Sequence, residues 1–278
     1  MTTVAILGAG AIGSAIAVRL AERARVRRIV AIDENAQAAA GKMLDIAQSG
    51  PIGRSDTHLS ATADALAAAG ADAIVIADDL AQGEWEGERG LTLVQRLARA
   101  GTTAPFVFAG PKQLWLLEAA ARELGIAPHR LVGTAASAAV PTLAALVHIE
   151  LGETGARVGV TGRPPVFVPA WSAATIGAAL LTDRVPAHRL LSLSATLGKF
   201  WPPGPQASAA PTALVVEALI MGSRRRHAAL AMLDGELGAR SVAGLAELEL
   251  GRGRILSHHL PTLSPQERTE AANAFLRR

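Results

Sequence analysis

The chain has 278 residues, of which half are hydrophobic but only 3% aromatic, so we expect one or two domains with a core of small aliphatic side chains. It contains no cysteine, which excludes disulfides, thiolate metal sites and a thiol nucleophile. The formal net charge is only +3, which argues against a nucleic-acid-binding surface.

The N-terminal segment predicts a strand, a glycine turn and a helix. Residues 4–7 form an apolar strand-like run, Gly8-Ala9-Gly10-Ala11-Ile12-Gly13 follows directly, and an apolar helical pattern begins at this turn. A second strand-like run, residues 28–32, ends at Asp33. Strand, glycine turn, helix, strand and acid are the dinucleotide-binding fingerprint in its required context.

Each feature of this turn has a physical role. Gly8 permits the tight turn, Gly10 lets the backbone approach a pyrophosphate, and Gly13 lets helix and strand pack closely. The helix N-terminus offers free N–H groups to the phosphates. Asp33 can accept hydrogen bonds from both ribose hydroxyls, which favours NAD over NADP because a 2′-phosphate would meet like charge. The alternative is a glycine turn that merely packs a helix on a sheet. The expected cofactor contacts are Gly8, Gly10, Ala11, Ile12, Gly13, Asp33 and Ala77.

Strand and helix signals alternate through the first half of the chain. Strand-like runs over 72–77 and 103–109 flank a helical pattern over 91–97, and another helical pattern over 114–124 ends at Gly125. This alternation predicts an α/β fold with a doubly wound parallel (Rossmann) sheet in residues 1–133. Ligands of that architecture lie at the carboxyl ends of the strands.

The second half changes character, and we expect a mixed α+β domain over residues 134–278, with a boundary near Gly133 and no obvious linker. Ser264 as cap and Pro265 at the first helical position predict the start of a closing helix. The expected elements before it are helices over 141–151, 187–197 and 207–221, and strands over 156–161, 166–168, 228–233 and 243–250.

Two uncharged runs could suggest membrane insertion. The N-terminal run lacks a basic flank and carries the glycine turn, so it is not expected to be a signal peptide. The run over 164–182 is interrupted by prolines and by Gly177, and a buried strand–turn–helix is the better interpretation. We therefore expect a cytoplasmic protein with no membrane partner.

The chain resembles the lactate/malate dehydrogenase family over nearly its whole length. The resemblance implies a dimer or tetramer of identical chains, or a hetero-oligomer with a related subunit, and apolar helices over 12–20 and 141–151 suit such an interface. It rests on the glycine turn with Asp33, and on Gly41-Lys42-Met43-Leu44-Asp45-Ile46, the stretch from Glu86 to Arg96, Arg130-Leu131-Val132-Gly133, Val168-Pro169-Ala170-Trp171-Ser172, Ser208-Ala209-Ala210-Pro211, Leu233-Asp234-Gly235-Glu236-Leu237-Gly238 and Leu263-Ser264-Pro265-Gln266-Glu267.

The resemblance also locates the positions that carry the chemistry of the family, and this chain departs from the pattern there. The family's acid/base histidine lies in a Gly-x-His-Gly-Asp turn, which here reads Gly162-Arg163-Pro164-Pro165-Val166. The orienting aspartate and the arginine that binds the substrate carboxylate correspond to Ala139 and Thr142. Proline can neither donate nor carry a proton.

The remaining positions depart as well. The arginine that polarises the carbonyl aligns with Gly90, and a second substrate arginine falls near Glu84. The asparagine that touches nicotinamide and substrate is Gly110. After the fourth strand the family has a small neutral turn, whereas this chain has Ala77-Asp78-Asp79 in a longer loop. If Asp78 faces the pyrophosphate, like charge weakens NAD binding; if it points to solvent, nothing is lost.

Two arginines remain as candidate catalytic residues. Arg89 lies one place before the polarising position, where a solvated lid arginine is the competing interpretation, and Arg163 lies in the pocket turn, where it is either an anion ligand or a surface residue. His258 and His259 could suggest a metal pair, but we expect a solvated turn and no metal site.

Three functions stay open. The first is an NAD(H)-binding homologue without 2-hydroxy acid dehydrogenase activity, in a regulatory or structural role. The second is an active NAD-dependent oxidoreductase on a 2-hydroxy or 2-oxo acid-like substrate with a rebuilt pocket. The third is a cofactor-free structural subunit of a hetero-oligomer.

Overall fold

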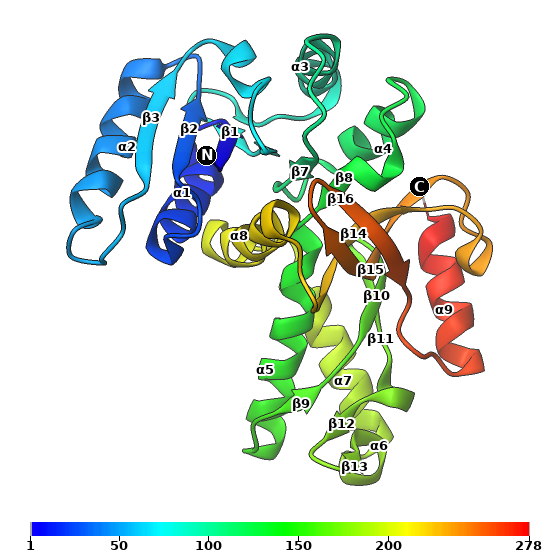
Figure 1. The fold of residues 1–278 in the computed structure, drawn as a ribbon. Helices are drawn as coiled ribbons and strands as arrows, with labels where there is room; N and C mark the ends of the chain where they lie inside the picture. The colour runs from blue at the N-terminus through cyan, green and yellow to red at the C-terminus, as the bar shows by residue number, and fades with distance from the viewer. Residues whose placement is uncertain (1, 278) are drawn as a thin grey trace.

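The computed structural model describes residues 2–277 and contains a sheet of 11 strands that runs through the molecule (Figure 1). Six strands in the order β3-β2-β1-β4-β7-β8 are all parallel, which confirms the doubly wound sheet predicted for the N-terminal half. Their bounds are β1 Thr3–Leu7, β2 Arg28–Ile32, β3 His58–Thr62, β4 Ala73–Ile76, β7 Phe106–Phe108 and β8 Leu131–Gly133.

Helices cover both faces of this parallel sheet, and the strands are apolar on both sides for that reason. Along β1, Val4 and Ile6 belong to one buried cluster with α1 and α8, whereas Ala5 and Leu7 belong to a second with α3 and α4. The helices are α1 Ala11–Arg23, α2 Ala36–Ser49, α3 Gly87–Arg99, α4 Leu114–Arg122 and α8 Pro205–Met221.

The sheet continues into the C-terminal half with antiparallel strands, beginning where Leu230 of β14 pairs with Gly133 of β8. The division at Gly133 therefore crosses a hydrogen-bonded sheet and stays a prediction. The antiparallel strands are β10 Val160–Arg163, β11 Val166–Pro169, β14 Arg226–Leu233, β15 Val242–Gly251 and β16 Arg254–His259.

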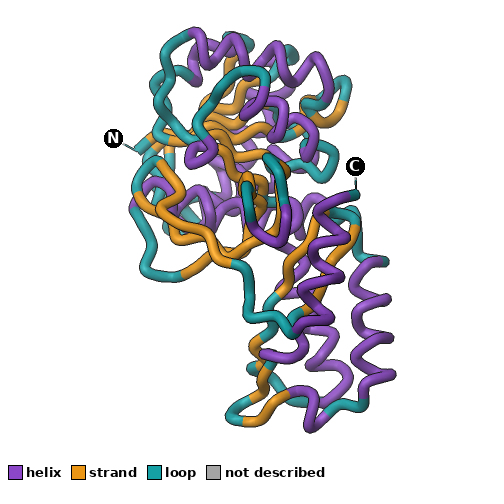
Figure 2. Tube along the Cα trace, turned by 90° about the vertical axis from the view of Figure 1, so that its right-hand side faces the viewer, coloured by secondary structure: helices purple, strands orange, loops and turns teal. Residues whose placement is uncertain are grey.

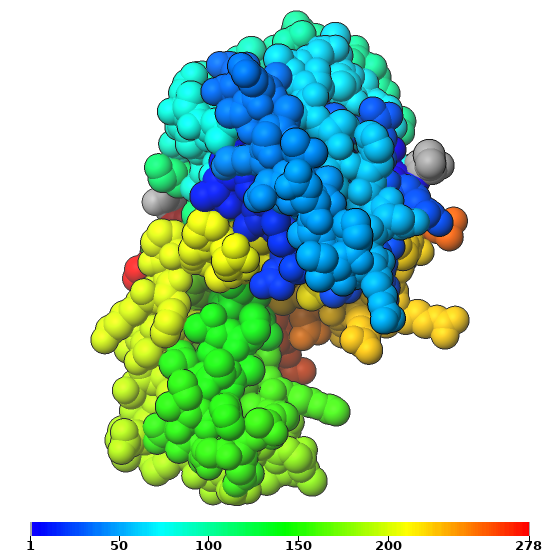
Figure 3. Space-filling view, turned by 90° about the vertical axis from the view of Figure 1, so that its left-hand side faces the viewer, coloured from blue at the N-terminus to red at the C-terminus, as the bar shows by residue number. Residues whose placement is uncertain are grey.

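The helices α5 and α7 extend away from the large sheet (Figure 1). Helices and short strands form the lower end of the molecule in Figure 2, and Figure 3 shows green and yellow-green atoms at that end and blue atoms at the other. A small second sheet lies near that end, with β9 Ala156–Arg157, β12 Thr175–Ile176 and β13 Ala179–Leu180. The remaining helices are α5 Ala139–Leu151, α6 Leu181–Arg184, α7 Ala187–Gly198 and α9 Pro265–Leu276.

Two local predictions were wrong. The strand expected over 156–161 is divided, because β9 pairs with β12 whereas β10 pairs with β11 and β15 in the other sheet. The histidines expected in a turn end strand β16, where they pair with β15. The start of α9 is confirmed, since the Ser264 side chain and Glu267 form a reciprocal capping box. Among residues 2–277, no helix is long and apolar enough to cross a membrane.

Candidate functional site

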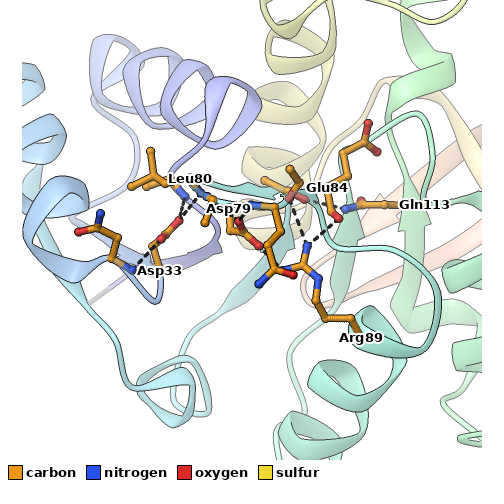
Figure 4. Close-up of polar contacts among 12 residues, drawn as sticks. Asp33, Asp79, Leu80, Glu84, Arg89 and Gln113 are labelled. Carbon is orange, nitrogen blue, oxygen red and sulfur yellow. Dashed lines mark hydrogen bonds and ion pairs between the residues drawn. The ribbon is translucent and has the colours of Figure 1, made fainter.

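The carboxyl ends of β1, β2, β4 and β7 converge at one edge of the sheet, where the glycine turn lies. Between β4 and α3 the chain forms a short hairpin of β5 Asp78–Asp79 and β6 Gly83–Glu84. Figure 4 shows side chains of this hairpin between Asp33 on one side and Gln113 on the other. This is where the architecture predicts a ligand.

Asp78 lies directly on the glycine turn. Its carboxylate oxygen Oδ1 accepts hydrogen bonds from the backbone N–H groups of Ile12 at 2.9 Å and Gly13 at 2.8 Å. Its backbone carbonyl accepts a third from the Gly10 N–H at 2.7 Å. A Cβ atom at Gly8 or Gly10 would collide with Asp78, so these glycines permit the close approach of the chain's own hairpin. The orientation of Asp78 that the sequence left open is therefore inward.

Asp33 is 2% exposed, and both of its carboxylate oxygens accept backbone hydrogen bonds. Oδ2 accepts from the N–H groups of Ala9 at 2.9 Å and Leu80 at 3.0 Å, while Oδ1 accepts from Asn35 at 3.0 Å (Figure 4). The carboxylate thus joins the glycine turn, the end of β2 and the hairpin.

Arg89, at the start of α3, is held by the same hairpin. It forms an ion pair with the buried carboxylate of Asp79 and donates to the backbone carbonyl of Glu84 at 2.9 Å. Its guanidinium carbon lies 4.0 Å from the ring centroid of Trp85. Burial of the Asp79 carboxyl opposes ionisation, but the hydrogen bond from Arg89 and two backbone N–H groups outweigh it and hold the pKa of Asp79 below its usual range. Arg89 is therefore neither a freely solvated side chain nor a free cation in a pocket.

On the other side of the hairpin, the Glu84 carboxylate lies against Gly110. It accepts the Lys112 N–H at 2.8 Å, and a Cβ atom at Gly110 would collide with it. Burial raises the pKa of Glu84. The Glu84 carboxylate thus lies where a side chain at position 110 would project.

Gln113 is a site residue that the sequence did not reveal. It is 1% exposed, donates from Nε2 to the Ala77 carbonyl at 2.8 Å, and accepts the Gly110 N–H at Oε1 at 3.0 Å. The Gln113 side chain thus forms hydrogen bonds at the carboxyl ends of both β4 and β7. Its only sequence signal was a polar residue just before an apolar helical pattern.

Pro164 and Arg163, in the turn between β10 and β11, lie in surroundings that differ from a catalytic pocket. Pro164 lines a small, mainly apolar space of about 10 Å³ with Gly110, Gly133 and Trp201, which is room for about one water. Arg163 forms a largely buried ion pair with Glu118, whose Oε1 also accepts the Ala243 N–H at 2.8 Å. Arg163 is therefore neither a free anion ligand nor a surface residue.

Ala139 and Thr142 lie in the first turn of α5 and face a different cavity. This cavity has a volume of about 100 Å³ and is lined mainly by apolar side chains, with Phe167, Leu197 and Trp201 among them. No charged residue lines it in the part of the chain that the structure describes. The cavity offers nothing that would bind a carboxylate by charge.

Residues 2–277 contain no group of three or more histidine, cysteine, aspartate or glutamate side chains that could hold a metal ion. His258 instead bonds Glu236 at 2.6 Å, and His259 lies 3.0 Å from the Ser257 hydroxyl. His258 is thus bonded to a side chain of another segment, and His259 to a side chain of its own strand, β16.

Comparison with known proteins gives a consistent family. Residues 2–99 match the model described as lactate/malate dehydrogenase, NAD binding domain. The malate dehydrogenase of Thermomicrobium roseum is 27% identical, with 98% of this chain and 95% of that protein covered. The malate dehydrogenase of Thioalkalivibrio sulfidiphilus is 26% identical, with 97% and 95% covered. In fold, the chain is similar to the minor L-lactate dehydrogenase of Enterococcus mundtii, with a TM-score of 0.84, 17% identity, and 98% of this chain and 95% of that chain covered.

The matching model implies NAD as the cofactor of the family. The residues of this chain, as they are arranged, do not fit that cofactor. The Asp78 carboxylate lies on the helix N–H groups that would bind the pyrophosphate, and the Asp33 carboxylate accepts three backbone N–H groups in place of ribose hydroxyls.

Proposed function

We propose that this chain, which belongs to the lactate/malate dehydrogenase family, has no 2-hydroxy acid dehydrogenase activity and serves in a regulatory or structural role. The observation that carries the proposal is Pro164. In the turn where the resemblance places the family's acid/base imidazole, the proline supplies no titratable group, and the space that it lines, about 10 Å³, has room for about one water.

The two arginines that could have rebuilt the site support the same conclusion. Arg89 and Arg163 are each paired with a carboxylate of the chain, Asp79 and Glu118 respectively. A guanidinium so engaged is not free to bind a substrate carboxylate as a fork or to polarise a carbonyl. A rebuilt pocket would therefore need a cation from elsewhere.

Charge near Gly110 adds a further obstacle. The Glu84 carboxyl lies against Gly110, with the acidic side chains of Asp78 and Glu86 and the cation of Lys112 near it, so acidic groups outnumber the cation there. An anionic substrate would meet like charge there.

The test is a sensitive assay of NADH oxidation with oxaloacetate, pyruvate and longer 2-oxo acids. Loss of general acid/base assistance costs roughly a hundred- to ten-thousand-fold, and loss of an electrostatic stabiliser roughly a further hundred-fold or more. We therefore expect no turnover above the blank, with the malate dehydrogenase of Thermomicrobium roseum as positive control. Turnover near ~10 per second on any of these acids would contradict the proposal.

A further inference from the structure

We propose that Asp78 is a built-in replacement for the cofactor's pyrophosphate, so that the glycine turn is closed by the chain itself and takes up no dinucleotide. The N-terminus of α1 begins after Gly10, which has no side chain to cap it. Its free N–H groups at Ile12 and Gly13 find their acceptor in the Asp78 carboxylate, 66 and 65 residues further along the chain. A carboxylate at this position satisfies the donors and complements the positive end of the helix dipole, as a phosphate would.

The same hairpin also occupies the ribose anchor. The Leu80 N–H donates to Asp33 Oδ2, which the Ala9 N–H bonds as well, while Asn35 bonds Oδ1. With 2% of Asp33 exposed, hydroxyl groups of a ribose could reach its carboxylate only if the Leu80 segment moved away. Two successive cofactor anchors are thus satisfied by residues 78–80.

Contacts of Asp79, Arg89 and Trp85 stabilise the hairpin in this closed position. Asp79 accepts the Ala81 N–H at 2.8 Å and pairs with Arg89, which in turn lies over Trp85. The backbone N–H of Trp85 donates to the Ala77 carbonyl at 3.2 Å. Displacing the hairpin would break these contacts together with those to the glycine turn and Asp33. A dinucleotide would have to displace all of them while bringing its own negative charge next to Asp78.

The first measurement is a titration of the wild-type protein with NAD and NADH, followed by calorimetry and by NADH fluorescence. We expect no saturable binding at concentrations up to about 1 mM, the weak end of specific ligand affinities. Saturable binding by the wild-type protein would overturn the proposal.

The second measurement asks whether one side chain keeps the turn closed. Asp78→Ala removes the carboxylate that caps α1, so the melting temperature should fall by about 2–4 °C. Inorganic pyrophosphate should then raise the melting temperature of this variant, because it needs the freed N–H groups of the glycine turn and not the Asp33 carboxylate. The wild-type protein and Asp45→Ala, which removes an exposed carboxylate on α2, should not respond.

The outcomes separate cleanly. If Asp78→Ala folds, as judged by circular dichroism, but responds to pyrophosphate no more than wild type, the proposal is overturned. Asp78→Gly is the second variant if the alanine variant does not fold, and the wild-type titration decides by itself if neither folds. A wild-type protein that bound NADH but turned over no 2-oxo acid would overturn the closed turn and leave the proposed function standing.

Discussion

Asp78, Pro164 and Arg163 make contacts within the chain, on a backbone whose fold is similar to that of a lactate dehydrogenase. The Asp78 carboxylate accepts the helix N–H groups, Pro164 lies in an apolar space of about 10 Å³, and Arg163 is paired with Glu118. Each interaction is satisfied within the chain. Substituting one of these residues therefore removes a contact that stabilises the fold, whether or not the new side chain adds a catalytic group.

Pro164→His alone should not restore dehydrogenase activity. The imidazole would lack an orienting carboxylate, because Ala139 stands at that position, and the cavity that faces Ala139 is lined mainly by apolar side chains. The assay is NADH oxidation with oxaloacetate and pyruvate, with wild type in parallel. Turnover by the single variant would show that the missing partners are supplied elsewhere.

Arg163→Ala should be strongly destabilising. The Arg163 and Glu118 side chains are 13% and 5% exposed, and removing Arg163 leaves the buried Glu118 carboxylate with the Ala243 N–H at 2.8 Å and a more distant guanidinium, that of Arg122 at 3.7 Å. Breaking a buried pair costs roughly 3–5 kcal/mol, and these two remaining contacts should keep the loss toward the lower end of that range. The control is Arg184→Ala, whose pair with Glu153 is exposed and is worth about 1 kcal/mol or less. Urea unfolding measures both. Equal, small losses in the two variants would contradict a structural role for Arg163.

At the scale of elements, Glu84 of the hairpin β5–β6 and Glu267 of the α9 capping box have pKa values that are shifted in opposite directions. Burial of Glu267 opposes ionisation, but hydrogen bonds from Ser172 and Ser264 outweigh it and lower the pKa of Glu267. In the hairpin, burial dominates and raises the pKa of Glu84. The Glu84 and Glu267 carboxyl groups should therefore contribute to stability with opposite pH dependence.

Glu267→Gln should destabilise the protein at neutral pH. Because the folded pKa of Glu267 is lowered, its contribution to stability is present above the unfolded pKa of about 4.3 and is lost as the pH falls through the folded value. Melting temperatures from pH 7 down to pH 3 should show the difference from wild type shrinking. A difference that stayed constant with pH would mean that the charge of Glu267 does not matter.

Glu84→Gln should instead stabilise the protein at neutral and alkaline pH. The raised folded pKa of Glu84 means that its contribution is present below the unfolded pKa of about 4.3 and is lost as the pH rises through the folded value. The glutamine carbonyl can still accept the Lys112 N–H. The same melting series should show an advantage for the variant that grows with pH, and a disadvantage at pH 8 would contradict the assignment.

For the whole molecule, self-association stays a prediction. The apolar face of the segment 12–20 is used inside the chain, where α1 packs on α8 and the sheet, so it does not offer an interface. Large apolar side chains are exposed elsewhere: Leu44 on α2 at 60%, Ile149 on α5 at 77% and Leu191 on α7 at 68%.

Light scattering at micromolar concentration should give at least twice the mass of one chain, because exposed apolar side chains of this size gain by burial at an interface. If α5 lies in the interface, Ile149→Lys should reduce the mass measured by light scattering. The substituted side chain is exposed in the single chain, so the fold of each chain should be retained. A wild-type mass of one chain would contradict the prediction.

Local patterns were sufficient for much of the fold. The apolar runs of β1, β2 and β4, the glycine turn before α1 and the cap at Ser264 each act over a few residues, so their spacing was enough to predict them. The absence of an imidazole in the turn at Gly162 was likewise evident from the residue types in that turn.

The sequence did not show where the side chains point. Asp78 meets the glycine turn across 65 residues and Arg163 meets Glu118 across 45, while residues 156–161 divide between two sheets. These outcomes depend on which distant segments lie alongside each other, and only the packed chain settles that, because the same carboxylate or guanidinium is equally stable in water until folding removes the water around it.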